Sequence, residues 1–198
     1  MNNKKIWIKS ILIPLILGGI VGIIVSKFMD YNTLQKPPLS PPGFLFGIVW
    51  SILYILMGIS YGILETKKLV DYRVNKAYYL QLIINLLWPI LFFVFKWRLF
   101  SCIWIILLII AIIYMIIVFY RKNKLSAYLQ IPYLLWTIFA TYLNIGVYLL
   151  NRWCKWGDVP NCIIYSYNNM ILLPILSTKP SSFNNFNSLI IALLSTFK

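Results

Sequence analysis

The sequence contains no histidine, only four acidic residues and only three cysteines in 198 residues. A His-ligated haem, a Ser-His-Asp triad and a zinc site are therefore excluded or nearly excluded. The scarcity of carboxylates likewise argues against the paired carboxylates of a glycosidase. The cysteines, Cys102, Cys154 and Cys162, show no metal-ligand or redox-pair spacing. We interpret them as small apolar residues.

Charged side chains are also scarce, at 11% of the sequence, whereas hydrophobic residues make up 61%. A soluble domain carries about 25% charged residues, so this composition predicts an integral membrane protein. The net charge of +14 would suit a nucleic-acid partner, but the lysines and arginines cluster at the ends of apolar runs. No nucleic-acid-binding motif accompanies them. We therefore expect them to face lipid headgroups and expect no nucleic-acid partner.

Five apolar runs are each long enough to cross a bilayer as a helix. They cover residues 7–26, 44–64, 77–95, 99–120 and 125–150. Lys4 and Lys5 precede the first run as they would in a signal peptide, but no small-residue cleavage site follows, so we expect a span. The sequence therefore predicts an all-α membrane protein, a bundle of five transmembrane helices.

Glycine pairs with GxxxG spacing occur in the first run, at Gly18 and Gly22, and in the second, at Gly58 and Gly62. This spacing allows two helices to approach closely. We expect such an approach at Gly18 and Gly22. The pair at Gly58 and Gly62 fits packing within one bundle or between two copies, and the sequence does not separate these alternatives.

The basic residues predict an orientation. The N-terminus and the second and fourth loops hold ten of the 18 lysines and arginines. This bias places the N-terminus in the cytoplasm and the first loop outside. Residues 152–198 are rich in asparagine, and their apolar patches are too short to span. We expect one transmembrane domain over residues 1–151 and a poorly ordered or peripheral extension over 152–198, with a sixth span as the minority alternative.

A proline-rich segment stands directly before the second run. Pro37-Pro38 and Pro41-Pro42 fix the backbone and prevent a helix, so this connector must be stiff. Trp50 and Tyr54 follow it near one side of the predicted helix. A stiff connector over an aromatic side suggests a binding site. The alternative is that the prolines only turn the chain and the aromatic residues only pack.

Polar and aromatic groups recur on the third and fifth runs. Asn85 and Trp88 share one helical face with Gln81 and Phe92, and an amide in hydrocarbon should point inward to a partner or ligand. On the fifth run, four-residue steps lead through Pro132, Trp136, Ala140 and Asn144. Interhelical hydrogen bonding is the alternative role for each asparagine. Convergence of these groups would form a flat, apolar slot for a planar aromatic ligand, with room beside the small Ala140.

Three motifs carry a family resemblance. They read L-x-K-P-x-x-x-P-P-x-x-x-F-x-x-V-W-x-x-L-Y over residues 34–54, Q-L-x-x-N-x-x-W-x-x-x-F-F over 81–93 and P-Y-L-x-W-x-x-F-A-x-x-L-N over 132–144. In order and spacing, the chain resembles the translocator protein family (TspO/MBR), also called tryptophan-rich sensory proteins, over about residues 6–151. The resemblance implies a five-helix membrane bundle, often dimeric, with a pocket under the first loop. It also implies binding of porphyrins such as protoporphyrin IX, of sterols in some members, and of benzodiazepine-type ligands.

The resemblance also implies site residues. Trp50 and Trp136 match pocket tryptophans that are linked in bacterial members to light-dependent porphyrin breakdown. Asn85, Ala140 and Asn144 match positions in or beside the pocket, and Tyr54 and Trp88 belong to the same motifs. The expected ligand-binding residues are thus Trp50, Tyr54, Asn85, Trp88, Trp136, Ala140 and Asn144. No residue is firmly catalytic, Trp50 and Trp136 being the candidates, and we expect no cofactor and no metal, with protoporphyrin IX as a ligand.

The resemblance favours a receptor or sensor in a bacterial cell membrane that binds a porphyrin-type, sterol-like or other flat apolar molecule. The alternatives are a light-dependent porphyrin-degrading enzyme and a porphyrin or sterol transporter. Transport is disfavoured because no buried charges or broken helices indicate a path. The chain departs from the family where Asp30 replaces a tryptophan, Phe44 replaces another, and Leu39 stands in a loop that often has more aromatic residues. We expect the loop to grip a flat ligand less firmly.

Overall fold

The computed structural model describes residues 3–30 and 33–153. Its elements are α1 (Asn3–Ser26), α2 (Gly43–Thr66), α3 (Tyr72–Pro89), the π-helix η1 (Ile90–Val94), α4 (Arg98–Tyr120), α5 (Lys124–Tyr128) and α6 (Ile131–Trp153). Five helical segments are long and apolar enough to span a membrane, and no strand occurs in these ranges. The predicted all-α, five-span bundle is therefore confirmed. The extension expected after residue 151 lies outside the described residues from residue 154 onward.

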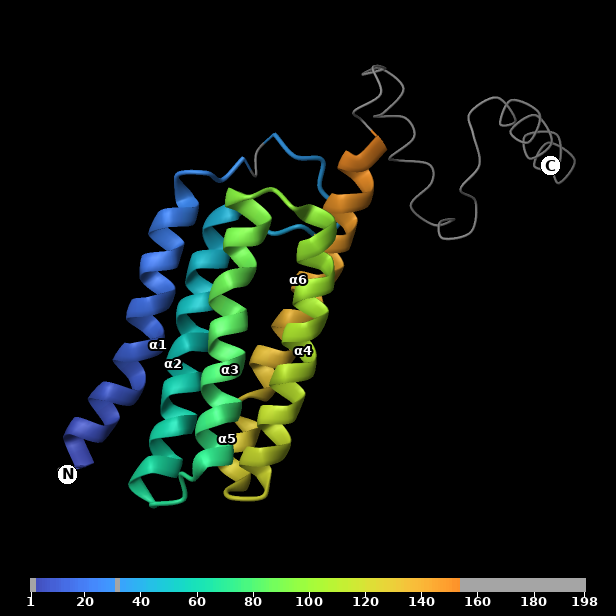
Figure 1. Ribbon diagram of the computed structural model, residues 1–198. Coiled ribbons are helices and arrows are strands. Elements are labelled where there is room, and N and C mark those ends of the chain that lie inside the picture. The colour runs from blue at the N-terminus through green and yellow to red at the C-terminus, as the bar shows by residue number, and fades with distance from the viewer. Residues whose placement is uncertain (1–2, 31–32, 154–198) are drawn as a thin grey trace, which may run out of the picture. The chain divides into compact units, whose positions relative to one another are not determined.

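The helices form a ring around a shared core. Helix α1 packs along α2, α3 packs along α4, and α4 packs along α6, while α1 also contacts α3. Figure 1 shows these segments running side by side, with the α2–α3 and α4–α5 turns at the same end as the N-terminus. The ring therefore runs α2, α1, α3, α4, α6. At its remaining seam, between α2 and α6, the short helix α5 fills one end, where the Ser60 hydroxyl donates 2.7 Å to the Ser126 carbonyl.

Small residues set the close packing of α1 on α2. A Cβ atom added at Gly58 would lie 2.6 Å from the Ile11 Cα atom, and one at Gly62 would lie 3.1 Å from the Trp7 ring. Gly18 faces the Tyr54 ring at a similarly close approach. The glycine pair of α2 thus serves packing within one bundle. The prediction for α1 is correct at Gly18 and wrong at Gly22, which is exposed and where an added Cβ atom would meet no neighbouring segment within 4 Å.

Proline breaks two of the predicted helices. The fifth run, expected as one helix, is divided into α5 and α6 at Leu129 and Gln130. Pro132 explains this, because it lacks a donor for the Tyr128 carbonyl and its ring would clash there. Similarly, Pro89 has no N–H to donate to the Asn85 carbonyl. The chain continues from α3 as the π-helix η1, in which the Phe95 N–H donates a hydrogen bond of 3.0 Å to the Ile90 carbonyl, five residues earlier.

The proline-rich first loop is fixed against α6. The Asn151 side chain accepts a hydrogen bond from the Gln35 backbone N–H (3.2 Å) and donates one to the Gln35 backbone carbonyl (2.9 Å). The Tyr142 hydroxyl donates to the Pro38 carbonyl at 3.0 Å. A Cβ atom at Gly146 would lie 2.6 Å from the Pro37 ring, so the loop rests directly on the α6 backbone. The loop is therefore a fixed cover over that end of the bundle.

Two further contacts tie the same loop to the neighbouring end of α3 and α4. Leu34 is buried against Phe92 of η1 and Val147 of α6. The Asp30 carboxylate pairs with the Lys96 ammonium at 3.1 Å and with the Arg98 guanidinium at 3.5 Å. Asp30 thus joins the first loop to the start of α4 by charge.

Candidate ligand site between α2 and α6

An apolar groove of about 510 Å³ lies along the seam between α2 and α6. It is open on one side, and its walls carry aliphatic and aromatic side chains with almost no polar surface. The lining residues are Val49, Ile52, Leu53, Leu56, Pro132, Leu135, Trp136 and Phe139. Since Ile52 and Leu135 are more than half exposed, the groove opens toward the lipid phase.

Trp136 is the predicted site residue that lines this groove. Its indole packs edge-on against Phe46 of α2 at 6.0 Å between ring centroids and against Phe139 at 5.5 Å. The indole Nε1 atom is buried and has no hydrogen-bond partner among the described residues. An unpaired buried donor is costly to the fold.

A hydrogen-bonded network occupies the interior of the bundle behind the groove. The Tyr54 hydroxyl donates to Asn85 Oδ1 (2.8 Å), and Asn85 Nδ2 donates to the Tyr133 hydroxyl (2.6 Å). Tyr133 donates to Gln81 Oε1 (3.0 Å), and Gln81 Nε2 donates to the Met57 sulfur (3.1 Å). All five residues are buried. The network joins α2, α3 and α6, and it satisfies the amide that the sequence places in hydrocarbon.

Trp50 packs on this network from α2. Its ring lies 5.9 Å from the Tyr54 ring, 6.1 Å from the Tyr133 ring and 6.3 Å from the Trp88 ring. Trp88 in turn packs against Ala140, so the indole of Trp88 takes up space that the small Ala140 leaves. The structure therefore brings together Trp50, Tyr54, Asn85, Trp88 and Ala140 from three helices.

Asn144 lies further along the buried face of α6 and faces α4. Its Oδ1 atom is 3.1 Å from the Ser101 hydroxyl and 3.3 Å from the Cys102 sulfur. Its Nδ2 atom is buried and has no partner within the described part of the chain. Asn144 is thus separated from the Tyr54–Asn85 pair, and its contacts are those of an interhelical hydrogen bond.

The four-residue steps of α6 explain why Trp136 and Asn144 face different neighbours. Each step of four residues turns a helix by about 40° beyond a full circle, so the eight residues between them rotate the direction by about 80°. The fully buried face instead carries Tyr133, Thr137, Ala140 and Asn144, at i, i+4, i+7 and i+11. Trp136 lies beside this face, toward α2.

This spacing is also the signal for a residue that the sequence prediction omitted. Tyr133 lies at the centre of the network, and its spacing to Ala140 and Asn144 places it on their face. Phe46 and Phe139, which pack on Trp136, were likewise not named as site residues, although both are fixed positions of the motifs that carry the family resemblance. No cluster of three or more metal-ligating side chains exists in the described ranges.

Comparison with known proteins agrees with this architecture. The model of the TspO/MBR family matches residues 10–150. This chain belongs to the TspO/MBR family. Its membership and its five apolar helices make it an integral membrane protein of a family that includes sensory and translocator proteins.

The relatives within the family come from distant organisms. The tryptophan-rich protein TspO of Archaeoglobus fulgidus is 39% identical over 154 residues, covering 76% of this chain and 99% of the relative. The human translocator protein is 33% identical over 154 residues, covering 72% of this chain and 83% of the relative. The tryptophan-rich sensory protein of Cereibacter sphaeroides is 29% identical over 131 residues, covering 66% and 82%. The family resemblance stated from the three motifs is therefore confirmed.

Proposed function

We propose that this TspO/MBR protein is a membrane receptor that binds a flat, mainly apolar ligand of the porphyrin type in the groove between α2 and α6. The groove carries the proposal, since its volume of about 510 Å³ is within the usual range for small-molecule sites. Trp136 and Phe139 offer ring faces for stacking. The buried Trp136 N–H has no partner among the described residues, so a turn of the indole toward the groove would let it donate to a carboxylate or carbonyl of the ligand.

The other predicted residues have a supporting role in this proposal. Trp50, Tyr54, Asn85 and Trp88 hold the interior surface on which the groove is built, and Ala140 and Asn144 keep α6 close to α3 and α4. A rigid supporting layer keeps a site in the geometry that its ligand needs. Trp136 contacts the ligand directly, and Trp50 contacts it only if the ligand reaches past Leu53.

A line of ring contacts supports a sensory role. Phe139 lines the groove and stacks on Tyr142 at 6.2 Å between centroids. Tyr142 donates the hydrogen bond to Pro38 in the first loop. A ligand that displaces Phe139 would therefore disturb the hold of α6 on this loop. The predicted orientation, with the N-terminus in the cytoplasm, places the loop on the outer face.

Titration of the purified protein with protoporphyrin IX tests this function, with the absorption of the bound pigment as readout. We expect saturable binding that Trp136→Phe weakens and that Trp50→Phe combined with Trp136→Phe weakens further. Trp97→Phe is the matched control, because Trp97 is exposed at the start of α4. Binding that the double variant leaves unchanged would overturn the proposal.

The same preparation separates the receptor from its alternatives. A porphyrin-degrading enzyme would bleach the pigment under illumination faster than a detergent control, and a transporter would move it into liposomes. A receptor shows neither effect while still binding. Native mass spectrometry of the same sample tests the predicted homodimer, and competition by a sterol tests a sterol-like ligand.

A further inference from the structure

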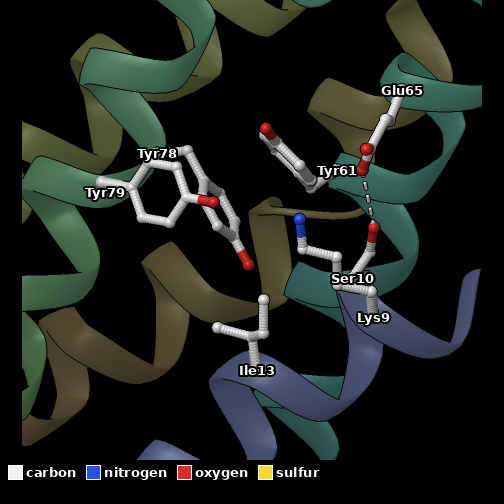
Figure 2. A pocket seen from close by; sticks show the side chains of 7 residues that line it. All are labelled: Lys9, Ser10, Ile13, Tyr61, Glu65, Tyr78 and Tyr79. Atoms are coloured by element: carbon white, nitrogen blue, oxygen red, sulfur yellow. Dashed lines mark hydrogen bonds between the residues drawn. The ribbon is translucent and has the colours of Figure 1, made fainter. Parts of the chain in front are cut away.

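A second, polar cavity lies at the other side of the ring, between α1, α2 and α3, at the end that holds the N-terminus. It encloses about 30 Å³ and is lined by Lys9, Ser10, Ile13, Tyr61, Glu65, Tyr78 and Tyr79. Figure 2 shows the Lys9 ammonium and the Tyr78 hydroxyl both directed into the space between these helices. No residue of this cavity belongs to the groove between α2 and α6.

Three tyrosines form one wall of this cavity. Tyr61 stacks on Tyr78 at 4.3 Å between centroids, and Tyr79 packs edge-on against Tyr78 at 5.2 Å. Tyr78 is only 2% exposed, yet its hydroxyl has no hydrogen-bond partner among the described residues. The Tyr61 hydroxyl, by contrast, donates to Asn75 Oδ1 at 2.6 Å. Tyr78 therefore presents an unsatisfied polar group to the cavity, which a bound group would satisfy.

Two opposite charges lie on the same cavity without pairing. The Glu65 carboxylate accepts a hydrogen bond of 3.1 Å from the Ser10 hydroxyl (Figure 2). The ion pairs formed by the described residues join Asp30 to Lys96 and Arg98 and Asp71 to Lys122, so Glu65 and Lys9 are not within 4.0 Å of one another. A ligand that carries both charges would complement this pair of side chains.

We propose that this cavity binds the headgroup of a phospholipid with a primary ammonium, that is, phosphatidylethanolamine, from the surrounding leaflet. The lipid ammonium takes the place into which the Lys9 ammonium now points, and it donates to Glu65 and to the Tyr78 oxygen. The flexible Lys9 side chain turns outward and pairs with the phosphate at the mouth. The location suits this ligand, because the cavity lies near the ends of the spans, where tyrosines meet lipid headgroups.

The size of the cavity selects among headgroups. The volume of about 30 Å³ exceeds the roughly 10–15 Å³ that one water molecule requires, and an ammonium group is similar in size to water, so it fits. The trimethylammonium of phosphatidylcholine is much wider and has no N–H donor. Phosphatidylglycerol has no cation for Glu65. The structure thus predicts a preference for the primary ammonium, although the positive charge of the chain would by itself favour an anionic lipid.

Native mass spectrometry of the full chain tests this proposal with dioleoyl phosphatidylethanolamine, phosphatidylcholine and phosphatidylglycerol, each added at equal concentration. We expect phosphatidylethanolamine to be retained about tenfold better than the other two, as for a charge-assisted hydrogen bond. Free phosphoethanolamine should bind far more weakly, which distinguishes a lipid from a soluble ligand. Equal retention of the three lipids would overturn the proposal, as would a preference for phosphatidylglycerol.

Three substitutions assign the preference to the cavity. Glu65→Gln and Lys9→Gln should each lower the retention of phosphatidylethanolamine to that of phosphatidylcholine. Tyr78→Phe removes only a hydroxyl without a partner, so the fold should persist while retention falls severalfold. Tyr72→Phe and Lys76→Gln are controls on α3 with exposed side chains, and they should match the unaltered protein. If Tyr78→Phe retains the lipid fully, the cavity holds a water molecule only, and the proposal is wrong.

Discussion

The Tyr54 hydroxyl on α2 donates a hydrogen bond of 2.8 Å to Asn85 Oδ1 on α3. Because this bond occupies the amide oxygen, the amide nitrogen of Asn85 is directed at Tyr133 on α6. Asn85 thus connects three helices of the ring, α2, α3 and α6. Two of these, α2 and α6, form the walls of the groove.

Substitution of Tyr54 by phenylalanine should lower stability modestly. It leaves the ring in place and removes the donor to Asn85, and an interhelical hydrogen bond contributes about 1 kcal/mol in a membrane protein. Thermal unfolding in detergent measures the effect. Tyr72→Phe, whose side chain is 77% exposed, is the control and should leave the melting temperature unchanged. Equal melting temperatures for both variants would show that the bond is energetically neutral.

Substitution of Gly58 by alanine should loosen α1 from α2. The new Cβ atom would meet the Ile11 and Ser10 backbone at 2.6 Å, and backbone atoms cannot move aside as a flexible side chain can. Gly22→Ala adds the same atom into open space and should be neutral or slightly stabilising, because alanine favours a helix over glycine. Melting temperatures of the two variants measure the contrast. The packing argument fails if Gly58→Ala is as stable as Gly22→Ala.

Substitution of Asn151 by alanine should release the first loop. It removes both hydrogen bonds to Gln35, while the helix keeps its backbone bonds. Hydrogen exchange at residues 33–42 should therefore become faster, with little change in α3 and α4. Leu149→Ala alters an exposed apolar residue two positions earlier and serves as the control. Unchanged exchange in the loop would mean that Leu34, Pro37 and Tyr142 hold it alone.

Acidification should weaken the start of α3 through Asp71. A hydrogen bond from Lys122 lowers the pKa of this carboxyl, and the Val74 backbone N–H at 2.8 Å lowers it further. Because the pKa is lower in the folded chain, the stabilisation is complete above the ordinary carboxyl pKa of about 3.9 and is lost as the pH falls through the folded value. When the melting temperature is measured against pH, its decrease at acid pH should be smaller for Asp71→Asn than for the unaltered protein.

Salt provides the internal control for this acid effect. The Asp71 side chain is well exposed, so the part of the effect that comes from Lys122 is screened at high ionic strength. The capping bond to Val74 is short-ranged and should persist. If the melting temperature of Asp71→Asn decreases on acidification as much as that of the unaltered protein, the effect comes from another group.

The sequence by itself determined the class of the protein, its family and the extent of its spans. Long apolar runs can satisfy their backbone groups in lipid only as helices, so composition and run length suffice for the five spans. The inward direction of Asn85 also followed from the sequence, because an amide cannot remain unpaired in hydrocarbon. The proline pairs similarly predicted a stiff connector from backbone geometry alone.

Only the tertiary structure decided which partner each side chain meets. The second and fifth runs carry aromatic residues on several faces, so periodicity did not distinguish Trp136 in the groove from Trp50 in the interior. The break at Pro132 changes the rotation of α6 relative to α5, and the ring order places α6 beside α4. Likewise, GxxxG spacing is the same at Gly22 and Gly58, and only the position of α1 makes one a close contact and the other an open surface. Contacts between distant segments depend on helix rotation and ring order, which no local pattern specifies.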